Sequence, residues 1–524
     1  MHSKSVLGAA LFTALARCTD PVDHRGNTTA ITVSGSVPHH AGTPLEAFVS
    51  YSIEFAFFPD FAGNSSEPNT FSNNLLNNLG NLQGTKPYIR VGGNTQDYAL
   101  YDSSLKTATF GIVNANRSVD YPTSLSVGPS YFESYTTWPN TKFIHGFNLG
   151  KNALESGRLL YWELGNEPDL FKTSAQGIVR PASWNEQDYV SEWLNGTRSI
   201  KAVLARACPD LGAPKWIAPS FAGTNNSLQP IQTWQGGLDA DKDIALISSH
   251  NYIGGATQPG VTLQGTLMNH SSTVRSISHQ LNESSYLATL LRSLNPSLPF
   301  ILGETDSLYN EGAPGLSNAF GAALWGVDFN LWCATNNIRR VHMHQGTDYR
   351  YGAWQPIETN KTTKGTKPPY YGSIAVAAMM GDLTKGTTAI ANLPLQHDEE
   401  AAYAAYVGGM LKRVMVINMH EYNYTIISSA APSPRPSQTY ALNVPQGCSG
   451  FGVVQRLMAN GSDAISGITW NGVSYDHELG NGMAVAMGNA TRNEILEVNS
   501  GVATLDVPWS SAAMVNLQCC KCGY

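Results

Sequence analysis

The segment Leu159–Phe171, with the sequence LLYWELGNEPDLF, starts as an apolar and aromatic run and then changes character abruptly. Its first six residues are typical of a buried β-strand. They lead directly into Gly165-Asn166-Glu167-Pro168, where glycine and proline end regular structure around an amide and a carboxylic acid. The segment raises the question of which fold needs a polar pair at the end of a core strand.

The surrounding sequence repeats a strand–helix alternation. The clearest amphipathic helix is expected after Ser183-Trp-Asn-Glu186, which has the spacing of a capping box. Eight apolar runs read as strands: Phe48–Phe57, Tyr88–Val91, Phe143–Phe147, Leu159–Leu164, Trp216–Pro219, Ile244–His250, Pro299–Leu302 and Arg340–His344. Eight strand–helix units predict an α/β fold, a (β/α)₈ TIM barrel, over residues 46–380.

The pattern changes after residue 380 to short runs of alternating hydrophobicity joined by glycine turns. Tyr403–Leu411 contains one such turn at Gly408-Gly409, which predicts a hairpin. The strand-like run Ala30–Val37 precedes the barrel and is expected to join the same unit. We therefore predict a C-terminal antiparallel β-sandwich domain formed by residues 27–45 and 381–524.

Composition argues for a secreted globular protein. Charged residues make up only 14% of the chain and the net charge is −7, so neither a nucleic acid nor a membrane is an expected partner. Residues 1–19 read as a signal peptide, with Lys4 before the apolar run Val6–Ala16. Glycosylation sequons, which fit an extracellular location, start at Asn27, Asn64, Asn116, Asn195, Asn225, Asn269, Asn282, Asn360, Asn423, Asn460 and Asn489.

The cysteines are expected to form at least one disulfide in an extracellular protein. Cys448 is expected to pair with one cysteine of the terminal cluster Cys519, Cys520 and Cys522, which would close a loop of about 70 residues. The alternative for the cluster is metal binding, which the absence of a matching His or Cys pair nearby disfavours. We expect no cofactor and no metal.

A second polar strand end resembles the first. In PFILGETDSLYN, Pro299–Asn310, an apolar strand leads into Gly303-Glu304. Strands four and seven of a barrel would thus bring Glu167 and Glu304 to its C-terminal mouth, where TIM-barrel active sites lie. One such glutamate alone is usually a solvated loop residue, but two in the same context favour the paired carboxylates of glycoside hydrolysis.

Other chemistries are less well supported. His342 and His344 have the spacing of metal ligands on a strand, although alternate histidines there more often line a polar pocket. The chain has no Gly-x-Ser-x-Gly nucleophile elbow, and the glycines of VGGNT are not followed by the residues of a phosphate-binding loop.

Four segments in order carry a family resemblance: SYSIEFAFF at strand one, IRVGGNTQD at strand two, ELGNEPD at strand four and GETDSLYN at strand seven. With these segments and the sandwich that follows, the chain resembles the clan A retaining glycosidases, and most closely glycoside hydrolase family 79, the β-glucuronidases and heparanase. The resemblance covers essentially the whole chain after the signal peptide.

The resemblance implies roles for the residues that match its motifs. Glu167 matches the acid/base and Glu304 the nucleophile. Asn166 matches the amide that binds the sugar 2-hydroxyl. Tyr252 or His250 matches the strand-six residue that orients the nucleophile, and both alternatives stay open.

Further positions would bind the sugar. Glu54 matches the strand-one acid that binds the outer hydroxyls, although it could instead be a buried acid paired with Arg90. Asn94 could reach the sugar or cap a loop.

The family's glucuronate carboxylate is held by hydroxyl groups and backbone N–H groups. Here Tyr309, the following Asn310-Glu311-Gly312 and Tyr351 (or Tyr349) match those donors, with Gly312 offering a backbone N–H. Aromatic packing, or stacking under a neutral sugar, is the alternative role for Tyr309 and Tyr351. Glu311 departs from the pattern, because an acid beside a sugar carboxylate would repel it.

The resulting hypothesis is a secreted, retaining exo-β-glucuronidase that removes terminal β-glucuronic acid, with or without a 4-O-methyl group, from a glycan or glycoprotein. With 32 basic against 39 acidic residues, a long basic cleft for endo cleavage of a sulfated chain is not expected. The alternatives are another clan A exo-glycosidase, such as an arabinofuranosidase or xylosidase, and a catalytically dead carbohydrate-binding barrel. The oligomeric state stays open.

Overall fold

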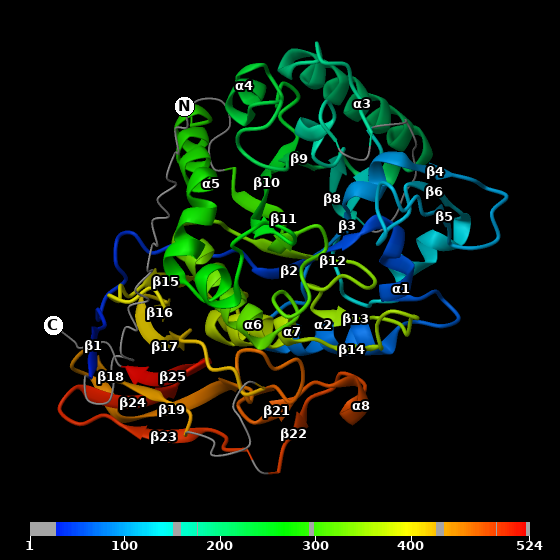
Figure 1. Cartoon of the computed structure of the whole chain (residues 1–524). Helices are drawn as coiled ribbons and strands as arrows, with labels where there is room; N and C mark the ends of the chain where they lie inside the picture. The colour runs from blue at the N-terminus through cyan, green and yellow to red at the C-terminus, as the bar shows by residue number, and fades with distance from the viewer. Residues whose placement is uncertain are drawn as a thin grey trace, which may run out of the picture.

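The computed structural model describes residues 28–149, 159–174, 177–292, 298–425, 434–488 and 490–519. Within these ranges the chain forms a closed barrel of eight parallel strands, with helices around it and further sheets, antiparallel except for the parallel pair β1 (Thr29–Thr32) and β18 (Ser437–Asn443), packed at one side (Figure 1). This confirms the predicted fold class. The predicted signal peptide lies outside the described residues.

The barrel closes where its last strand pairs with its first, from Val341↔Val49 to Gln345↔Ile53. Its strands, in chain order, are β2 (Val49–Glu54), β3 (Ile89–Gly92), β7 (Phe143–Phe147), β8 (Leu159–Leu164), β9 (Trp216–Phe221), β10 (Ile244–Gly255), β11 (Phe300–Tyr309) and β12 (Val341–Gln345). Strands six and seven run longer than predicted, because β10 and β11 stay paired as far as Gly255↔Tyr309. In β8, Trp162 is buried, whereas Leu160 is only partly buried.

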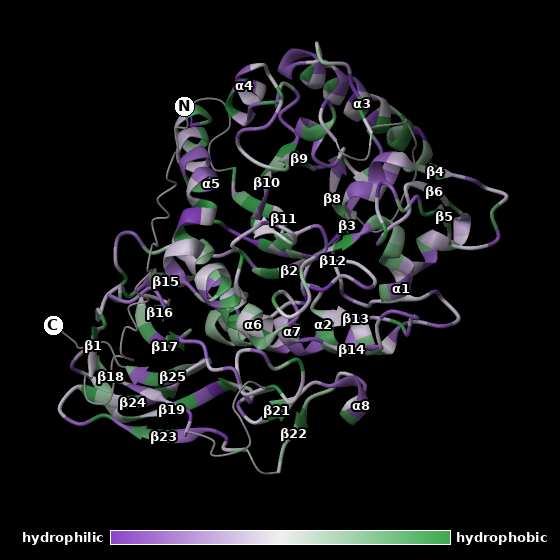
Figure 2. Ribbon diagram, viewed as in Figure 1, coloured by the Kyte–Doolittle hydropathy of each residue, from purple (hydrophilic) through white to green (hydrophobic). Residues whose placement is uncertain are grey.

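Helices separate the barrel from solvent on most sides. The main ones are α1 (Phe58–Ala62), α2 (Thr70–Gln83), α3 (Glu186–Ala207), α4 (Pro230–Gln235), α5 (His270–Leu290), α6 (Phe320–Thr335) and α7 (Pro368–Met380). Figure 2 shows α3 and α5 with hydrophilic and hydrophobic residues mixed, as in amphipathic surface helices. Helices α6 and α7 are buried almost all round, because they lie between the barrel and the antiparallel sheets (Figure 1).

The N-cap of helix α3 lies two residues later than the sequence suggested. The N-cap is Asn185, whose Oδ1 accepts hydrogen bonds from the backbone N–H groups of Gln187 (2.9 Å) and Asp188 (3.2 Å). Asp188 completes the capping box by accepting the Asn185 N–H at 3.1 Å. The predicted box from Ser183 to Glu186 was therefore wrong in register, because Asn and Asp provide the same reciprocal pairing two positions later.

A three-stranded sheet is inserted between the second and third barrel strands and was not predicted. It consists of β4 (Ala99–Tyr101), β5 (Thr109–Ile112) and β6 (Ser124–Val127), in the order β4-β6-β5. In Figure 1 it projects from the side of the barrel. Its loops reach the mouth of the barrel, where Asn94 contacts Tyr121.

Strands β13 (Trp354–Gln355) and β14 (Gly365–Thr366) pair with each other, and the other strands form two larger sheets. One contains β15 (Thr388–Asn392), β16 (Glu400–Val407), β17 (Met410–Asn418), β25 (Ser511–Cys519), β19 (Cys448–Met458), β20 (Thr469–Trp470), β21 (Val473–Ser474), β22 (Val485–Ala486) and β23 (Glu494–Glu497). The other contains β1 (Thr29–Thr32), β18 (Ser437–Asn443) and β24 (Val502–Pro508). Side chains of both sheets, including Ile31, Val416 and Leu505, form a shared core.

The hairpin, the N-terminal strand and the disulfide of these two sheets can be compared with the sequence predictions. Gly408 and Gly409 both have positive φ and connect β16 to β17 in the expected hairpin. The N-terminal strand pairs with β18, but it covers Thr29–Thr32 and is shorter than the expected run. A disulfide joins Cys448 to Cys519 across a separation of 71 residues, which confirms that Cys448 pairs with the terminal cluster. Cys520 and Cys522 lie outside the described residues.

The described helices include none that combines the length and apolar character needed to cross a membrane.

Candidate active site

The end of β8 is shaped to point two side chains across the barrel mouth. Gly165 has φ +84°, and a Cβ there would lie 2.8 Å from a methyl carbon of Leu149. Glu167 itself adopts the left-handed conformation (φ 48°), which is uncommon for a residue other than glycine. The backbone N–H of Asn166 donates to Asp97 Oδ2 at 2.9 Å, and that of Glu167 donates to the Ser220 carbonyl at 3.0 Å. These contacts hold an unusual backbone conformation, as is common at functional sites.

Glu167 and Glu304 face each other at the mouth. A carboxylate oxygen of each and a ring nitrogen of His250 all lie within 4.8 Å of one another. Retaining glycosidases hold their two carboxyl groups about 5–5.5 Å apart, whereas inverting ones leave about 6.5–9.5 Å for a water molecule. The pair therefore has the spacing for direct attack by one carboxylate on the sugar.

Glu304 is surrounded by groups that stabilise its ionised form. Arg90 Nη1 donates to Oε2 at 2.8 Å and Tyr252 Oη donates to Oε1 at 2.8 Å, while His344 Nδ1 lies 3.7 Å away. Burial alone would raise the pKa of this carboxyl, but the charges of His344, His250 and Arg90 and the Tyr252 hydrogen bond lower it to about 2. Glu304 is thus held as an anion close to Glu167.

Glu167 has the opposite environment. Burial, followed by the negative charge of Glu304, raises its pKa to about 8, although Arg90 and His344 act in the other direction. Its Oε1 is hydrogen-bonded to His250 Nδ1 at 2.9 Å. Burial lowers the pKa of His250 to about 4, so the imidazole is neutral near pH 7. Two carboxyl groups whose pKa values are pushed apart fit the roles of acid and nucleophile.

The contacts separate the two candidates for the strand-six partner of the nucleophile. Tyr252 contacts Glu304, whereas His250 contacts Glu167. Tyr252 therefore occupies the place that the resemblance gives to the nucleophile's partner, and His250 orients the other carboxyl group.

Arg90 lies at the centre of a buried network that sequence reasoning did not find. Its side chain is fully buried, and it donates to Glu163 Oε2, Ser52 Oγ and Asn166 Oδ1, each at 2.8 Å, as well as to Glu304. A buried guanidinium needs such partners to offset its desolvation. The signal for this network was an Arg and a Glu placed within two apolar strands, where charged residues are rare.

Glu54 is buried but is not paired with Arg90, so that alternative was wrong. The Thr95 backbone N–H donates to Glu54 Oε1 at 2.9 Å, and Tyr349 Oη and His344 Nε2 lie 3.4 Å from Oε2. The strand register explains the difference: Arg90 sits opposite Ser52, and Glu54 sits opposite Gly92. The acid lies in the mouth, close to His344.

Asn94 belongs to a chain of hydrogen bonds beside the catalytic pair. Its Oδ1 accepts from Asn166 Nδ2 and its Nδ2 donates to Tyr121 Oη, both at 3.2 Å. This arrangement brings Asn94 to the site rather than to a loop cap. Tyr121 was not predicted, since the inserted sheet that carries it has no strong sequence signal.

Three buried tyrosines, Tyr121, Tyr349 and Tyr351, pack together at one side of the mouth, and we call them the tyrosine wall. The ring of Tyr351 also lies 6.2 Å from that of Tyr252, centroid to centroid. The wall places both alternatives for the second tyrosine near the nucleophile.

The other residues expected to hold a sugar carboxylate lie farther round the mouth. Tyr309 is 47% exposed, with its ring against Gly255. The Gly312 N–H donates to the Leu308 carbonyl at 3.0 Å. Gly312 also has φ +81°, and a Cβ there would come within 2.9 Å of the Tyr351 nitrogen, so glycine allows this loop to approach the tyrosine wall.

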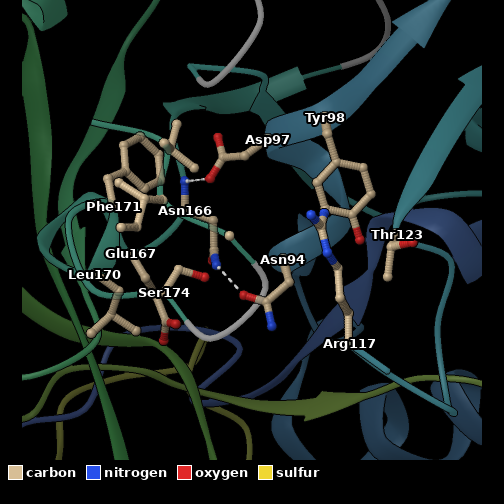
Figure 3. Close-up of a pocket in the computed structure, with 13 residues that line it drawn as sticks. Asn94, Asp97, Tyr98, Arg117, Thr123, Asn166, Glu167, Leu170, Phe171 and Ser174 are labelled. Atoms are coloured by element: carbon tan, nitrogen blue, oxygen red, sulfur yellow. Dashed lines mark hydrogen bonds between the residues drawn. The ribbon is translucent and has the colours of Figure 1, made fainter. Parts of the chain in front are cut away.

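A cavity of about 390 Å³ opens beside Asn166 and Glu167 (Figure 3). Small-molecule sites commonly occupy about 300–1,000 Å³. In Figure 3, Leu170 and Phe171 lie with Glu167 at one side of the cavity, opposite Tyr98 and Arg117. Glu167 and Asn166 are therefore accessible to a ligand the size of a sugar.

Among the described residues, one group of His, Cys, Asp and Glu side chains is close enough to hold a metal ion, and it is the group Glu167, His250 and Glu304. His342 is directed elsewhere, since its Nδ1 lies 3.0 Å from the Leu302 carbonyl oxygen. His344 lies between Glu54 and Glu304 in the sugar site.

Comparisons with known proteins agree with this geometry. Residues 402–514 match the model of the glycosyl hydrolase family 79 C-terminal beta domain. A β-glucuronidase of Aspergillus niger is 58% identical over 98% of this chain and 99% of its own, and a β-glucuronidase of Neurospora crassa is 51% identical over 89% and 90%.

Solved structures show the same architecture. A 4-O-α-L-rhamnosyl-β-D-glucuronidase from Fusarium oxysporum 12S superposes with a TM-score of 0.73 at 25% identity, covering 93% of this chain and 100% of that one. A family 51 α-L-arabinofuranosidase from Bifidobacterium longum reaches a TM-score of 0.60 at 11% identity, over 93% and 99%. The second likeness concerns the fold alone.

Proposed function

The chain belongs to glycoside hydrolase family 79, and from this membership we propose that it is a secreted, retaining exo-β-glucuronidase. Its substrate would be a glycan or glycoprotein that carries terminal β-glucuronic acid, with or without a 4-O-methyl group. The observation that carries the proposal is the pair Glu167 and Glu304, within 4.8 Å of each other and with pKa values shifted in opposite directions. Extracellular location is supported by the signal-like residues 1–19 and the glycosylation sequons.

The first step forms a bond between the sugar and the enzyme. An oxygen of ionised Glu304 attacks the anomeric carbon, and the bond from that carbon to the glycosidic oxygen breaks. Protonated Glu167 gives its proton to the departing oxygen. The Arg90 and Tyr252 hydrogen bonds hold the Glu304 carboxylate in place, and Asn166 is held by Arg90 where the 2-hydroxyl would bind.

The second step releases the sugar. Esterification of Glu304 removes the negative charge that raises the pKa of Glu167, so this carboxyl group loses its proton more readily. Glu167 then accepts a proton from a water molecule, whose oxygen attacks the anomeric carbon and displaces Glu304. Two displacements at the same carbon return the β configuration.

The pH profile follows from the two pKa values. Glu167 must be protonated in the first step, so kcat/KM on a substrate with a poor leaving group should fall as the pH rises through about 8. Glu304 must be ionised, so activity on the acid side should persist until the pH falls toward about 2 or the protein unfolds. Initial rates from pH 3 to 10 measure the basic limb and show whether activity persists down to pH 3. A basic limb that persists unchanged in Glu167→Gln would assign it to another group.

The proposed preference for glucuronic acid over neutral sugars depends on Tyr309 and Tyr351. A buried sugar carboxylate needs hydrogen-bond donors. Tyr351, beside Tyr252, and Tyr309, the last residue of β11, can offer hydroxyl groups. We expect aryl β-glucuronide to be cleaved at least about 100-fold more efficiently than aryl β-glucoside or β-xyloside, because two or three hydrogen bonds to a charged group contribute roughly 1.5–3 kcal/mol each.

Tyr309→Phe and Tyr351→Phe provide the test of this pocket. Each should lower kcat/KM for the glucuronide by about 10-fold while changing the rate on the glucoside much less, because only the glucuronide has a carboxylate to lose. A glucoside cleaved as well as the glucuronide by the unaltered protein would contradict the proposed substrate. A 4-O-methyl glucuronide in the same panel measures whether the methyl ether is accepted.

A further inference from the structure

An ionic cluster closes one side of the barrel mouth, outside the catalytic pair. It consists of Arg350, Asp120 and Glu311, and we call it the Arg350 cluster. Arg350 Nη1 and Nη2 contact the two carboxylate oxygens of Asp120 at 3.0 and 3.2 Å, and Nη2 lies 3.6 Å from Glu311 Oε2. The three side chains are 25%, 10% and 15% exposed, respectively. A two-pronged arginine pair of this kind has a defined geometry.

The cluster ties together three loops that are far apart in the sequence. Asp120 lies in the inserted sheet between β5 and β6, Glu311 follows β11, and Arg350 follows β12. Arg350 also donates through Nε to the Gly312 carbonyl (3.0 Å), through Nη2 to that of Asn310 (3.3 Å) and through its backbone N–H to that of Glu311 (2.7 Å). One side chain therefore fixes the loop after β11 to the inserted sheet.

Each end of the arginine–aspartate pair is next in sequence to the tyrosine wall. Asp120 precedes Tyr121, and Arg350 stands between Tyr349 and Tyr351. The wall in turn contacts the sugar site, through Tyr349 Oη and Glu54 at 3.4 Å and through Tyr121 Oη and Asn94 at 3.2 Å. Loss of the Arg350 cluster would remove the contacts that hold the loops of the tyrosine wall in place.

The position of a bound sugar follows from the chemistry, on the assumption that the proposed function is right. The anomeric carbon C1 must lie between Glu167 and Glu304. In a six-membered sugar ring C4 is across the ring from C1, so O4 points away from this pair. Glu54 ends strand β2, and β2 and β3 lie across the closed barrel from β9 and β10, the two strands that stand between β8 and β11. The tyrosine wall contacts Glu54 through Tyr349 Oη.

We infer that the Arg350 cluster closes the sugar site at its O4 end, so that the enzyme requires a glucuronic acid with no sugar attached to O4. This deepens the proposed function, because it identifies the structural feature that makes the enzyme act on chain ends. A glycosyl group on O4 would need the space that the wall and the loop after β11 occupy.

The cluster also resolves the conflict over Glu311. Glu311 lies beside the guanidinium of Arg350, which also binds Asp120. The positive charge of Arg350 therefore offsets the repulsion between Glu311 and a sugar carboxylate. Burial and the nearby Asp120 raise the pKa of Glu311 to about 7, while Arg350 opposes this shift. Without Arg350, Glu311 would lose the cation beside it and Asp120 would keep only Lys361 Nζ, 3.8 Å away, so the tie between the two loops would be lost.

The test compares two aryl β-glucuronides, one unsubstituted and one with an α-L-rhamnosyl group on O4. For the unaltered protein we expect kcat/KM for the substituted compound to be at least about 100-fold lower. In Arg350→Gln that ratio should shrink by about 10-fold or more, because the O4 end opens while the catalytic pair stays in place. Asp120→Asn should act in the same direction and keeps the bonds from Arg350 to the loop after β11.

Arg198→Gln is the matched control. Arg198, on helix α3, makes the same two-pronged contact with Asp241 (2.8 and 3.0 Å) on the outside of the barrel, and its loss should leave the ratio unchanged. Efficient cleavage of the substituted compound by the unaltered protein would overturn the inference, as would an unchanged ratio in folded Arg350→Gln and Asp120→Asn. Failure to cleave the unsubstituted glucuronide would instead contradict the proposed function.

Discussion

Replacing Glu304 with glutamine is expected to lower kcat on every β-glucuronide by about 10⁴-fold or more, because an amide cannot form the glycosyl-enzyme. The effect should not depend on the leaving group, since the nucleophile is needed whatever group departs. The fold should survive, because Gln keeps the shape of the side chain and Arg90 keeps its contact with Glu163. Steady-state rates with purified protein, together with a thermal unfolding curve, measure both expectations.

A buried glutamate outside the catalytic pair provides the control. Glu283 on α5 has its pKa raised to about 8 by burial and by the charge of Asp169, so glutamine there mimics the protonated form. Glu283→Gln should therefore keep near-normal turnover. If Glu304→Gln also kept it, the assignment of the nucleophile would be wrong.

Replacing Glu167 with glutamine should have an effect that depends on the leaving group. For a poor leaving group such as an alkyl alcohol, loss of general acid catalysis should lower kcat/KM by about 10²–10⁴-fold. For a dinitrophenyl leaving group, which needs no proton, kcat/KM should change much less, because only the first step is reported by that ratio. The comparison uses one variant and a series of aryl and alkyl glucuronides.

A uniform loss across that series would contradict the role of Glu167 as acid. His250 is a useful second probe, since it contacts Glu167 and not Glu304. The dependence on leaving group distinguishes a proton donor from a residue that only holds the site together.

The fold and the catalytic pair could be predicted from the sequence because both depend on local patterns. Strand–helix alternation marks each barrel unit, and Glu167 and Glu304 each follow an apolar strand directly. Barrel topology then brings the two strand ends to one face, whatever their separation along the chain.

The supporting contacts could not be predicted, because they depend on register and on distant loops. Arg90 and Glu54 lie on neighbouring strands, and only the pairing of Arg90 with Ser52 shows that the two do not meet. Asp120 and Arg350 are 230 residues apart, and the inserted sheet that carries Asp120 is short and partly exposed. Neither leaves a periodic pattern in the sequence.

The most direct test of the central claim is to trap the glycosyl-enzyme and locate it. The protein is treated with a 2-fluoro-glucuronyl fluoride, in which the 2-fluoro group slows the second step, and its mass is measured before and after proteolysis. One glucuronyl group per chain, in the peptide that contains Glu304, is the predicted result. A label on another residue, or no label in a preparation that hydrolyses aryl glucuronide, would contradict the mechanism.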